Sequence, residues 1–251
     1  MYEWNEIALN LAKDIEKEIM PLFGHKKAGE FIGFSPSGDK TKLVDKMAED
    51  IVLEYLKPLG VNIISEEIGT INNESEYYVI VDPIDGSFNF IHGIPVFGFS
   101  FAVFKGDEPL YAMLYEFITK NVYEGIPNEG AYLNGEMIRT RPLNENSISI
   151  SFYTRNRGAK LVEKVRRTRV LGAIAIELAY LARGSLDGVI DIRNYVRPTD
   201  IAAGYIIAKE AGAIVTDDEG RELRFNLNAS EKLNIIAVND EKLLKLILEN
   251  I

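Results

Sequence analysis

The sequence predicts a mixed α/β protein made of two fused lobes. Apolar residues recur at helical spacing near the N-terminus, short strand-like runs fill the rest of the first half, and strands alternate with helices after Pro142. Such alternation is typical of an α/β lobe. We therefore expect an N-terminal α+β lobe over residues 1–142 and a C-terminal α/β lobe over residues 143–251.

The first lobe opens with two predicted helices. In residues 3–20, Trp4, Leu11 and Ile15 belong to an apolar stripe at helical spacing, and Pro21 stops the pattern. A second stripe covers residues 41–56, after a Gly-, Ser- and Pro-containing stretch that we interpret as a mobile flap. Strand-like runs follow in VNIIS, YYVIVD, FGFSFAVF, LYAMLY and KNVYEG, and GAYLNGE indicates a strand that ends in a turn.

The second lobe is predicted from alternating patterns. The expected strands cover residues 147–152, 168–172, 186–192, 213–216 and 233–239. The expected helices lie near 160–166, across 174–184, from 200 to 212 and at the C-terminal end. No internal repeat or low-complexity linker separates the two lobes, so we expect them to share a surface.

Composition excludes several classes of function. The 251 residues are 47% hydrophobic, as in ordered globular proteins, yet no apolar run reaches membrane-spanning length and the charged N-terminal segment is no secretory signal, so we expect a cytoplasmic protein. The chain has no cysteine and two histidines, which removes thiolate chemistry and nearly all imidazole chemistry. A net charge of −10 argues against a nucleic-acid partner. Oxygen ligands remain in quantity.

The segment YYVIVDPIDGSFNF is the most informative in the chain. An apolar strand runs into Asp82, and Pro83 and Gly86 predict a turn that points Asp82 and Asp85 toward the same space. The backbone amides of Gly86 and Ser87 would then be free to face an anion. Taken alone, the D-P and D-G pairs are also ordinary turn signals.

Further carboxylates are expected near this segment. Glu66 and Glu67 end the preceding strand, and if that strand neighbours the one ending in Asp82, all these side chains lie at one sheet edge. Asp200 is a candidate helix N-cap, a position that would also keep its carboxylate ionised and suit a metal ligand. Ligands of oxygen alone favour Mg²⁺, or Mn²⁺ in its place, over zinc.

A nucleotide-binding P-loop is an alternative interpretation of residues 33–41, GFSPSGDKT. The stretch nearly spells G-x-x-x-x-G-K-[ST], but Asp39 is inserted before Lys40 and would place a negative charge where phosphates should lie. No clear strand leads into the loop. Asp45 follows in the second predicted helix, where by itself it is typical of a solvated charge.

Together these residues resemble the inositol monophosphatase family, and most closely its archaeal members, which combine inositol monophosphatase and fructose-1,6-bisphosphatase activities. The matching motifs are SEE at 65–67, DPIDGSFNF at 82–90, the Asp39-to-Asp45 spacing, GAYLNG at 130–135, RVLGA at 169–173, and TDIAAG with EAG over 199–212. They cover nearly the whole chain in the order of the family. The resemblance implies the layered αβαβα sugar-phosphatase fold, a homodimer and inhibition by lithium.

The resemblance also implies roles for individual residues. Two or three Mg²⁺ ions per subunit would be bound by Glu66, Asp82, Asp85, Asp200 and the carbonyl of Ile84. Asp45 and Ser87 would activate the attacking water together with Glu66, and Asp39 on the flap would help to bind a further metal. Substrate contacts would come from Asp85, Gly86, Ser87, Arg169, Gly172, Ala173, Ile174, Arg193, Arg197 and Asp200.

The implied reaction is hydrolysis of a phosphate monoester by metal-activated water, without a phosphoenzyme. Such hydrolysis is among the slowest uncatalysed reactions, so positioned cations are the effect large enough to carry the rate. The inositol-contacting Glu of the family has no equivalent in DIRNYVRPTD, which favours a substrate with a second phosphate, such as fructose 1,6-bisphosphate, over inositol 1-phosphate.

The expected anchor for a second phosphate is an arginine, because its guanidinium binds phosphate through paired hydrogen bonds. We expect Arg169 first, then Arg193 and Arg197, although each of them could instead be a surface arginine paired with a nearby acid. Two other functions remain open: a 3′-phosphoadenosine 5′-phosphate phosphatase, and a non-catalytic nucleotide- or cation-binding protein.

Overall fold

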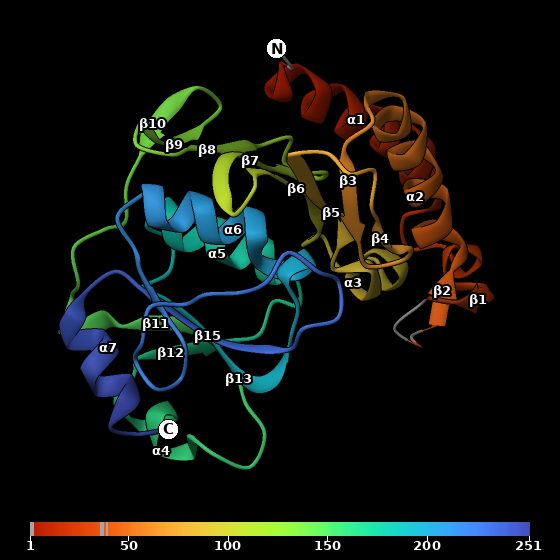
Figure 1. The fold of residues 1–251 in the computed structure, drawn as a ribbon. Helices are drawn as coiled ribbons and strands as arrows, with labels where there is room; N and C mark the ends of the chain where they lie inside the picture. Colours follow the sequence, from red (N-terminus) through yellow and green to blue (C-terminus); the bar gives the residue numbers. More distant parts are fainter. Residues whose placement is uncertain (1–2, 36–37, 39) are drawn as a thin grey trace.

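Helices and sheets alternate in layers in this computed structural model, which describes residues 3–35, 38 and 40–251 (Figure 1). One outer layer holds α1 (Trp4–Ile19) and α2 (Leu43–Leu56). The first sheet follows, then a central layer of α5 (Ile174–Ala182) and α6 (Pro198–Glu210), and then the second sheet. The other outer layer holds α4 (Ala159–Lys164) and α7 (Glu241–Leu248). The predicted αβαβα fold class is confirmed.

The first sheet has eight strands in the order β10-β9-β8-β7-β6-β5-β3-β4. Their bounds are β3 Asn62–Ser65, β4 Gly69–Ile71, β5 Tyr77–Asp85, β6 Gly98–Lys105, β7 Glu108–Glu116, β8 Val122–Ile126, β9 Gly130–Leu133 and β10 Glu136–Ile138. Neighbouring strands are antiparallel except β3 and β5, which run parallel with Ser65 opposite Val81. This parallel pair brings two strand ends to one edge.

The second sheet has five strands in the order β12-β11-β13-β15-β14. Their bounds are β11 Ser149–Tyr153, β12 Arg167–Arg169, β13 Gly188–Val196, β14 Ile214–Thr216 and β15 Leu233–Val238. β11 runs parallel to β12 and β13, whereas β15 is antiparallel to both its neighbours. The first sheet ends at Ile138 and the second begins at Ser149, so a lobe boundary near residue 142 remains our proposal.

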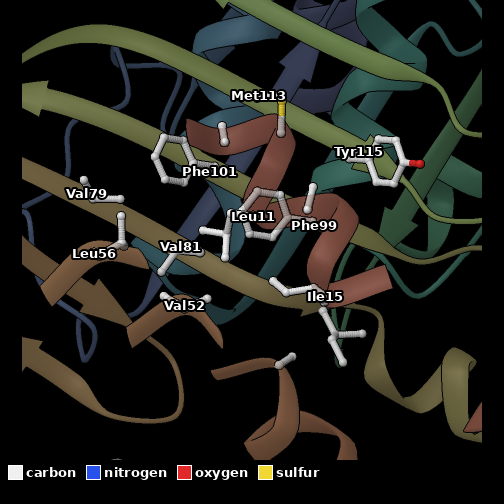
Figure 2. Packing of buried hydrophobic residues seen from close by; sticks show 14 of the residues in the cluster. Leu11, Ile15, Val52, Leu56, Val79, Val81, Phe99, Phe101, Met113 and Tyr115 are labelled. Atoms are coloured by element: carbon white, nitrogen blue, oxygen red, sulfur yellow. The ribbon is translucent and has the colours of Figure 1, made fainter. Parts of the chain in front are cut away.

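The outer helices pack on the first sheet through fully buried side chains. Leu11 and Ile15 of α1 and Leu56 of α2 meet Val81 and Phe99 of the sheet (Figure 2). The apolar stripe that predicted each helix is therefore the face that contacts the sheet. Burying such side chains stabilises the fold by about 1.5–3 kcal/mol each.

The central helices contact both sheets, which explains their composition. Nearly every residue of α5 is buried, and a helix that is apolar all round has no solvent face. α6 approaches α5 closely at Gly204, where an added Cβ would lie 2.7 Å from the Leu178 side chain. The two sheets thus share one layer of helices.

The structure differs from the sequence predictions mainly at element ends. The strand expected over 168–172 ends at Arg169, and the helix expected from Asp200 begins at Pro198 with Arg197 at its N-cap. Residues 31–34 (β1, Phe31–Phe34) and 40–42 (β2, Lys40–Lys42) form an antiparallel hairpin that the sequence did not predict. The short helix α3 (Ser87–His92) was likewise missed. Among the described residues, no helix has the length and apolar character that crossing a bilayer requires.

Candidate active site

Three carboxylates converge where β3, β5 and α6 meet. β3 and β5 are parallel, and Ser65 pairs with Val81. The next residue of each chain segment, Glu66 and Asp82, therefore lies at the same end of the two strands. Asp200 comes from the first turn of α6. One oxygen from each of these three side chains lies within 4.8 Å of the others. The expected convergence of distant acids is present in the structure.

Asp85 joins these three residues from the end of β5, and we call the four carboxylates the acidic cluster. Asp82 Oδ1 accepts a hydrogen bond from the Ile84 amide at 3.0 Å, and Asp85 Oδ2 accepts one from the Ile176 amide of α5 at 3.2 Å. Asp200 Oδ2 accepts from the Arg197 amide at 2.8 Å. Amides at the N-termini of α5 and α6 thus donate hydrogen bonds to the cluster. The partial positive charge of these helix ends stabilises the ionised carboxylates.

Electrostatics within the acidic cluster favour a bound cation. Desolvation, followed by the charges of neighbouring carboxylates, raises the pKa of Asp82 well above its ordinary value. Desolvation also raises the pKa of the half-buried Glu66 to about 8 and that of Asp200 to about 6, and the charge of Asp200 adds to the effect at Glu66. Carboxylates that converge in this way offer oxygen ligands, which Mg²⁺ prefers. A bound Mg²⁺ would also offset the repulsion between their negative charges.

A hollow of about 380 Å³ lies beside the acidic cluster. Besides the cluster itself it is lined by Ile84, Gly86, Ser87, Phe88, Tyr153, Gly172, Ile174, Arg193, Tyr195, Val196 and Arg197. Segments that are far apart in the chain therefore form one pocket, and its size is within the range of small-molecule sites. Ala173, also expected at the substrate, is buried behind Gly86 and is not part of this lining.

Gly86 connects the acidic cluster to the first backbone amides of α3. Its φ is +88°, and an added Cβ would lie 3.0 Å from the Ala173 Cβ and 3.2 Å from the Gly172 carbonyl oxygen. Only glycine fits this conformation and space. The residue serves as the N-cap of α3, so the first amides of that helix have no partner inside the helix and can face an anion.

Asp45 and Ser87 form a pair at the edge of the hollow. Asp45 lies in the first turn of α2 and is 7% exposed, which contradicts the interpretation of a solvated charge. Burial raises the pKa of Asp45, whereas its contact with Lys42 and the hydrogen bond from the Ser87 hydroxyl lower it. Lys42 Nζ also lies 3.1 Å from Ser87 Oγ. The sequence analysis missed Lys42, and Asp39 lies outside the described residues.

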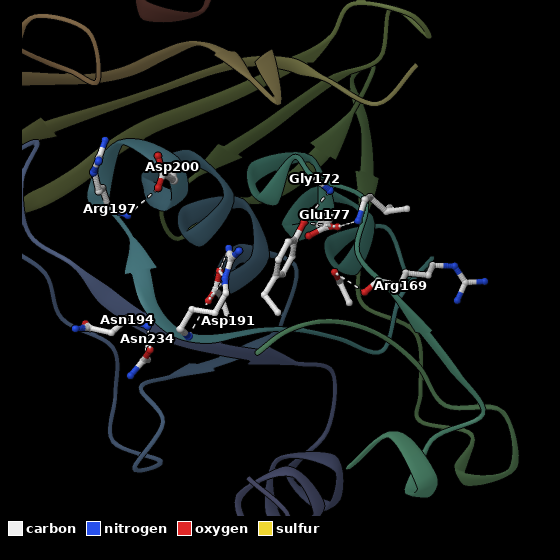
Figure 3. Close-up of polar contacts among 12 residues, drawn as sticks. Arg169, Gly172, Glu177, Asp191, Asn194, Arg197, Asp200 and Asn234 are labelled. Carbon is white, nitrogen blue, oxygen red and sulfur yellow. Dashed lines mark hydrogen bonds and ion pairs between the residues drawn. The ribbon is translucent and has the colours of Figure 1, made fainter. Parts of the chain in front are cut away.

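The three predicted arginines differ in their placement. Arg193 and Arg197 line the hollow, whereas Arg169 does not, and its Nη1 donates to Ser149 Oγ at 2.7 Å. Figure 3 shows the Arg169 side chain pointing away from Asp200. The prediction that Arg169 is the first anchor therefore finds no support in the structure. Arg169 is the last residue of β12, and its side chain is bonded to Ser149 within the second sheet.

Arg193 pairs with a buried acid and lies over two aromatic rings. Its Nη2 lies 2.5 Å from Asp191 Oδ2, and its Nε also donates to this fully buried carboxylate. The guanidinium lies over the rings of Tyr153 and Tyr195, at 4.5 Å and 5.1 Å from their centroids. Arg197 instead pairs with Glu66 through Nη1 at 3.2 Å. The two tyrosines carry no sequence signal, because only tertiary packing brings them to Arg193.

The loop that brings Gly172 to the hollow is fixed by a buried network. Glu177 Oε1 accepts from the Tyr153 hydroxyl at 2.9 Å and from the Leu171 amide, and the Tyr153 hydroxyl accepts from the Gly172 amide at 2.8 Å (Figure 3). Burial raises the pKa of Glu177 to about 7. The sequence analysis did not single out Glu177, since it lies within an otherwise apolar helix.

Comparison with known proteins identifies the family. The profile described as "Inositol monophosphatase family" matches residues 1–251. The chain belongs to the inositol monophosphatase family. The predicted family is confirmed, and membership also confirms the predicted enzyme class, a phosphatase that hydrolyses phosphate monoesters.

Two curated members of the inositol monophosphatase family are similar over nearly their full length. A fructose-1,6-bisphosphatase/inositol-1-monophosphatase of Thermococcus kodakarensis is 61% identical over 248 residues, covering 99% of this chain and 97% of the relative. A fructose-1,6-bisphosphatase of Pyrococcus furiosus is 58% identical over 245 residues, covering 98% and 96%.

A solved member of the family has the same fold. The crystal structure of an inositol monophosphatase–fructose 1,6-bisphosphatase superposes with a TM-score of 0.97 at 53% identity, covering 100% of both chains. The P-loop alternative finds no support, because β1 and β2 form an antiparallel hairpin whereas a P-loop connects a strand directly to a helix.

Proposed function

We propose that this protein is a Mg²⁺-dependent phosphatase whose first substrate is fructose 1,6-bisphosphate and whose second is inositol 1-phosphate. The observation that carries the proposal is the meeting of Glu66, Asp82 and Asp200 within 4.8 Å beside a hollow lined by Gly86 and Ser87. The name of the Thermococcus kodakarensis relative supports both substrates, and the name of the Pyrococcus furiosus relative supports fructose 1,6-bisphosphate. Homodimerisation, the cytoplasmic location and inhibition by lithium stay predictions.

The acidic cluster would bind the cations, with the carbonyl of Ile84 as a further ligand. Two or three Mg²⁺ ions fit our expectation for the family, and Mn²⁺ could replace them because both prefer oxygen ligands. When bound, these cations supply the positive charge that stabilises the developing charge on the phosphoryl and leaving oxygens.

The remaining steps belong to side chains and amides of this protein. The amides of Gly86 and Ser87 hold the phosphoryl oxygens, and Ser87 with Asp45 orients a water molecule and takes a proton from it. The water oxygen attacks phosphorus in line, the ester P–O bond breaks, and the leaving alkoxide takes a proton from solvent. The products are inorganic phosphate and the alcohol.

Arg193 becomes our first choice for the anchor of a second phosphate. It lines the hollow, and its contacts with Asp191 and the two tyrosines fix the guanidinium before substrate arrives. Such preorganisation lowers the entropy that binding must overcome. Arg197 differs in that its partner, Glu66, belongs to the acidic cluster, whereas Asp191, the partner of Arg193, does not.

The test is a phosphate-release panel with Mg²⁺ over fructose 1,6-bisphosphate, inositol 1-phosphate and 3′-phosphoadenosine 5′-phosphate. We expect release from the first two substrates, and Arg193→Ala should lower kcat/KM for fructose 1,6-bisphosphate by about tenfold while changing inositol 1-phosphate less. Arg169→Ala is the matched control, because that arginine lies outside the hollow. Equal losses on both substrates would reject Arg193 as the anchor, and no release from any compound would reject the phosphatase.

A further inference from the structure

Lys42 touches the pair proposed to activate water, although neither the sequence motifs nor the family match assigns it a role. It ends β2 and is the N-cap residue of α2. Its Nζ lies 3.1 Å from Ser87 Oγ and 3.9 Å from Asp45 Oδ2. The side chain is 32% exposed, so it is partly shielded from water.

The hydrogen-bonding capacity of Ser87 explains what this contact can do. A hydroxyl offers one donor and two acceptor positions. Ser87 donates its proton to Asp45 and accepts from the Lys42 ammonium, which can only donate. One acceptor position of Ser87 Oγ is then left, and an attacking water can donate into it. Without Lys42, the hydroxyl could rotate and accept from other donors.

Lys42 reaches Ser87 from outside the substrate hollow. It does not line the hollow beside the acidic cluster but a neighbouring one of about 430 Å³, with Lys26, Gly29, Phe88, Ile91 and His92. Phe88 lines both hollows and so lies between them. A lysine in this place supports Ser87 from behind instead of meeting the substrate.

The contact is not needed to begin helix α2. The bond that caps the helix runs from the backbone amide of Lys42 to Asp45 Oδ2, at 3.3 Å, and any residue except proline at position 42 can make it. The ammonium group therefore takes no part in this cap. Its positive charge also lies beside the buried carboxylate of Asp45.

We infer that Lys42 is a positioning residue that fixes the Ser87 hydroxyl between Asp45 and the attacking water. The inference rests on the function proposed above and adds to it a residue that acts through Ser87. Lys42 forms no bond with substrate and gives up no proton in the reaction. Its contribution therefore belongs to kcat, through the orientation of Ser87, and not to KM.

The test compares Lys42→Met, Lys42→Gln and Lys42→Arg with the wild-type protein, using Mg²⁺ and either fructose 1,6-bisphosphate or p-nitrophenyl phosphate. We expect Lys42→Met and Lys42→Gln to lower kcat by about tenfold or more with KM within about twofold, and Lys42→Arg to recover most of the loss. Lys46→Met is the matched control, because Lys46 lies one turn along α2, is half exposed and pairs with Asp50.

A double-mutant cycle separates positioning from a merely structural effect. If Lys42 acts through Ser87, then Lys42→Met should change kcat by less than about twofold in a Ser87→Ala background. Independent losses that multiply would overturn the inference, as would a raised KM with unchanged kcat, which would mean direct substrate binding. Wild-type protein that releases no phosphate would overturn the proposed function itself, and this inference with it.

Discussion

The carboxylate of Asp187 and those of the acidic cluster have opposite surroundings. Both oxygens of Asp187 are bonded to protein donors: Arg141 through Nε and Nη2, the Ser149 amide and the Asn239 amide group, at 2.5–3.0 Å. The acidic cluster has fewer donors and more carboxylates, and its members raise one another's pKa values. Replacing an acid whose oxygens are bonded to the protein leaves its partners unpaired and destabilises the fold, whereas acids that face each other retain oxygens for an external cation.

The largest expected effect tests the cluster side of this comparison. Asp82→Asn should lower phosphate release on the order of a thousandfold or more, because a central ligand of the proposed cations is lost. The metal-free variant should unfold at the same temperature as the wild-type protein or higher, because a carboxylate with a raised pKa is removed. Activity above a few per cent, or a clearly lower unfolding temperature, would contradict the assignment.

The opposite pattern is expected for Asp187→Asn. The change leaves Arg141 without its paired carboxylate and turns one acceptor into a donor, so the free energy of unfolding should fall by about 3 kcal/mol. Denaturant unfolding in metal-free buffer measures the loss. Well below the unfolding temperature, kcat should stay near the wild-type value. A stable but inactive variant would show that Asp187 serves catalysis and not stability.

Metal removal offers a further way to distinguish the acidic cluster from Asp187. At a free Mg²⁺ concentration about a hundredfold above its Kd, binding should stabilise the native state by about 2.7 kcal/mol. Thermal unfolding with Mg²⁺ and with a chelator should show this increment in the wild-type protein and in Asp187→Asn. It should vanish in Asp82→Asn, and an undiminished increment there would place the cation elsewhere.

Glu49 is intermediate between Asp187 and the acidic cluster, because only one of its oxygens is bonded within the described part of the protein. It is fully buried, one oxygen accepts from the Ser65 hydroxyl, and the other has no hydrogen-bond partner among the described residues. Burial raises the pKa of Glu49 from 4.5 to about 7. The folded state thus binds the proton more tightly than the unfolded state, so stability should fall as pH rises from 4.5 to 7 and then level off.

Glu49→Gln should remove this part of the pH dependence. We expect it to reduce the fall in the free energy of unfolding between these pH values by about 2 kcal/mol relative to the wild-type protein. Chemical denaturation at a series of pH values without metal measures the difference. Parallel curves for the two proteins would show that Glu49 does not titrate there.

Most element types, the family and the carboxylates of the acidic cluster could be predicted from the sequence. Apolar stripes predict helices because burial on one face imposes helical spacing, and Asp82 and Asp85 could be found because turn residues follow an apolar strand. Glu66 was placed correctly because parallel strands end at one edge.

The neighbours of these residues could not be predicted from the sequence. Lys42 and Ser87 are 45 positions apart, and Tyr153 and Arg193 meet across β11 and β13, so no local pattern records either contact. The register of those strands and the end of β12 at Arg169 turned the choice of anchor from Arg169 to Arg193. Side-chain direction depends on packing between layers, and sequence periodicity specifies only which face is buried.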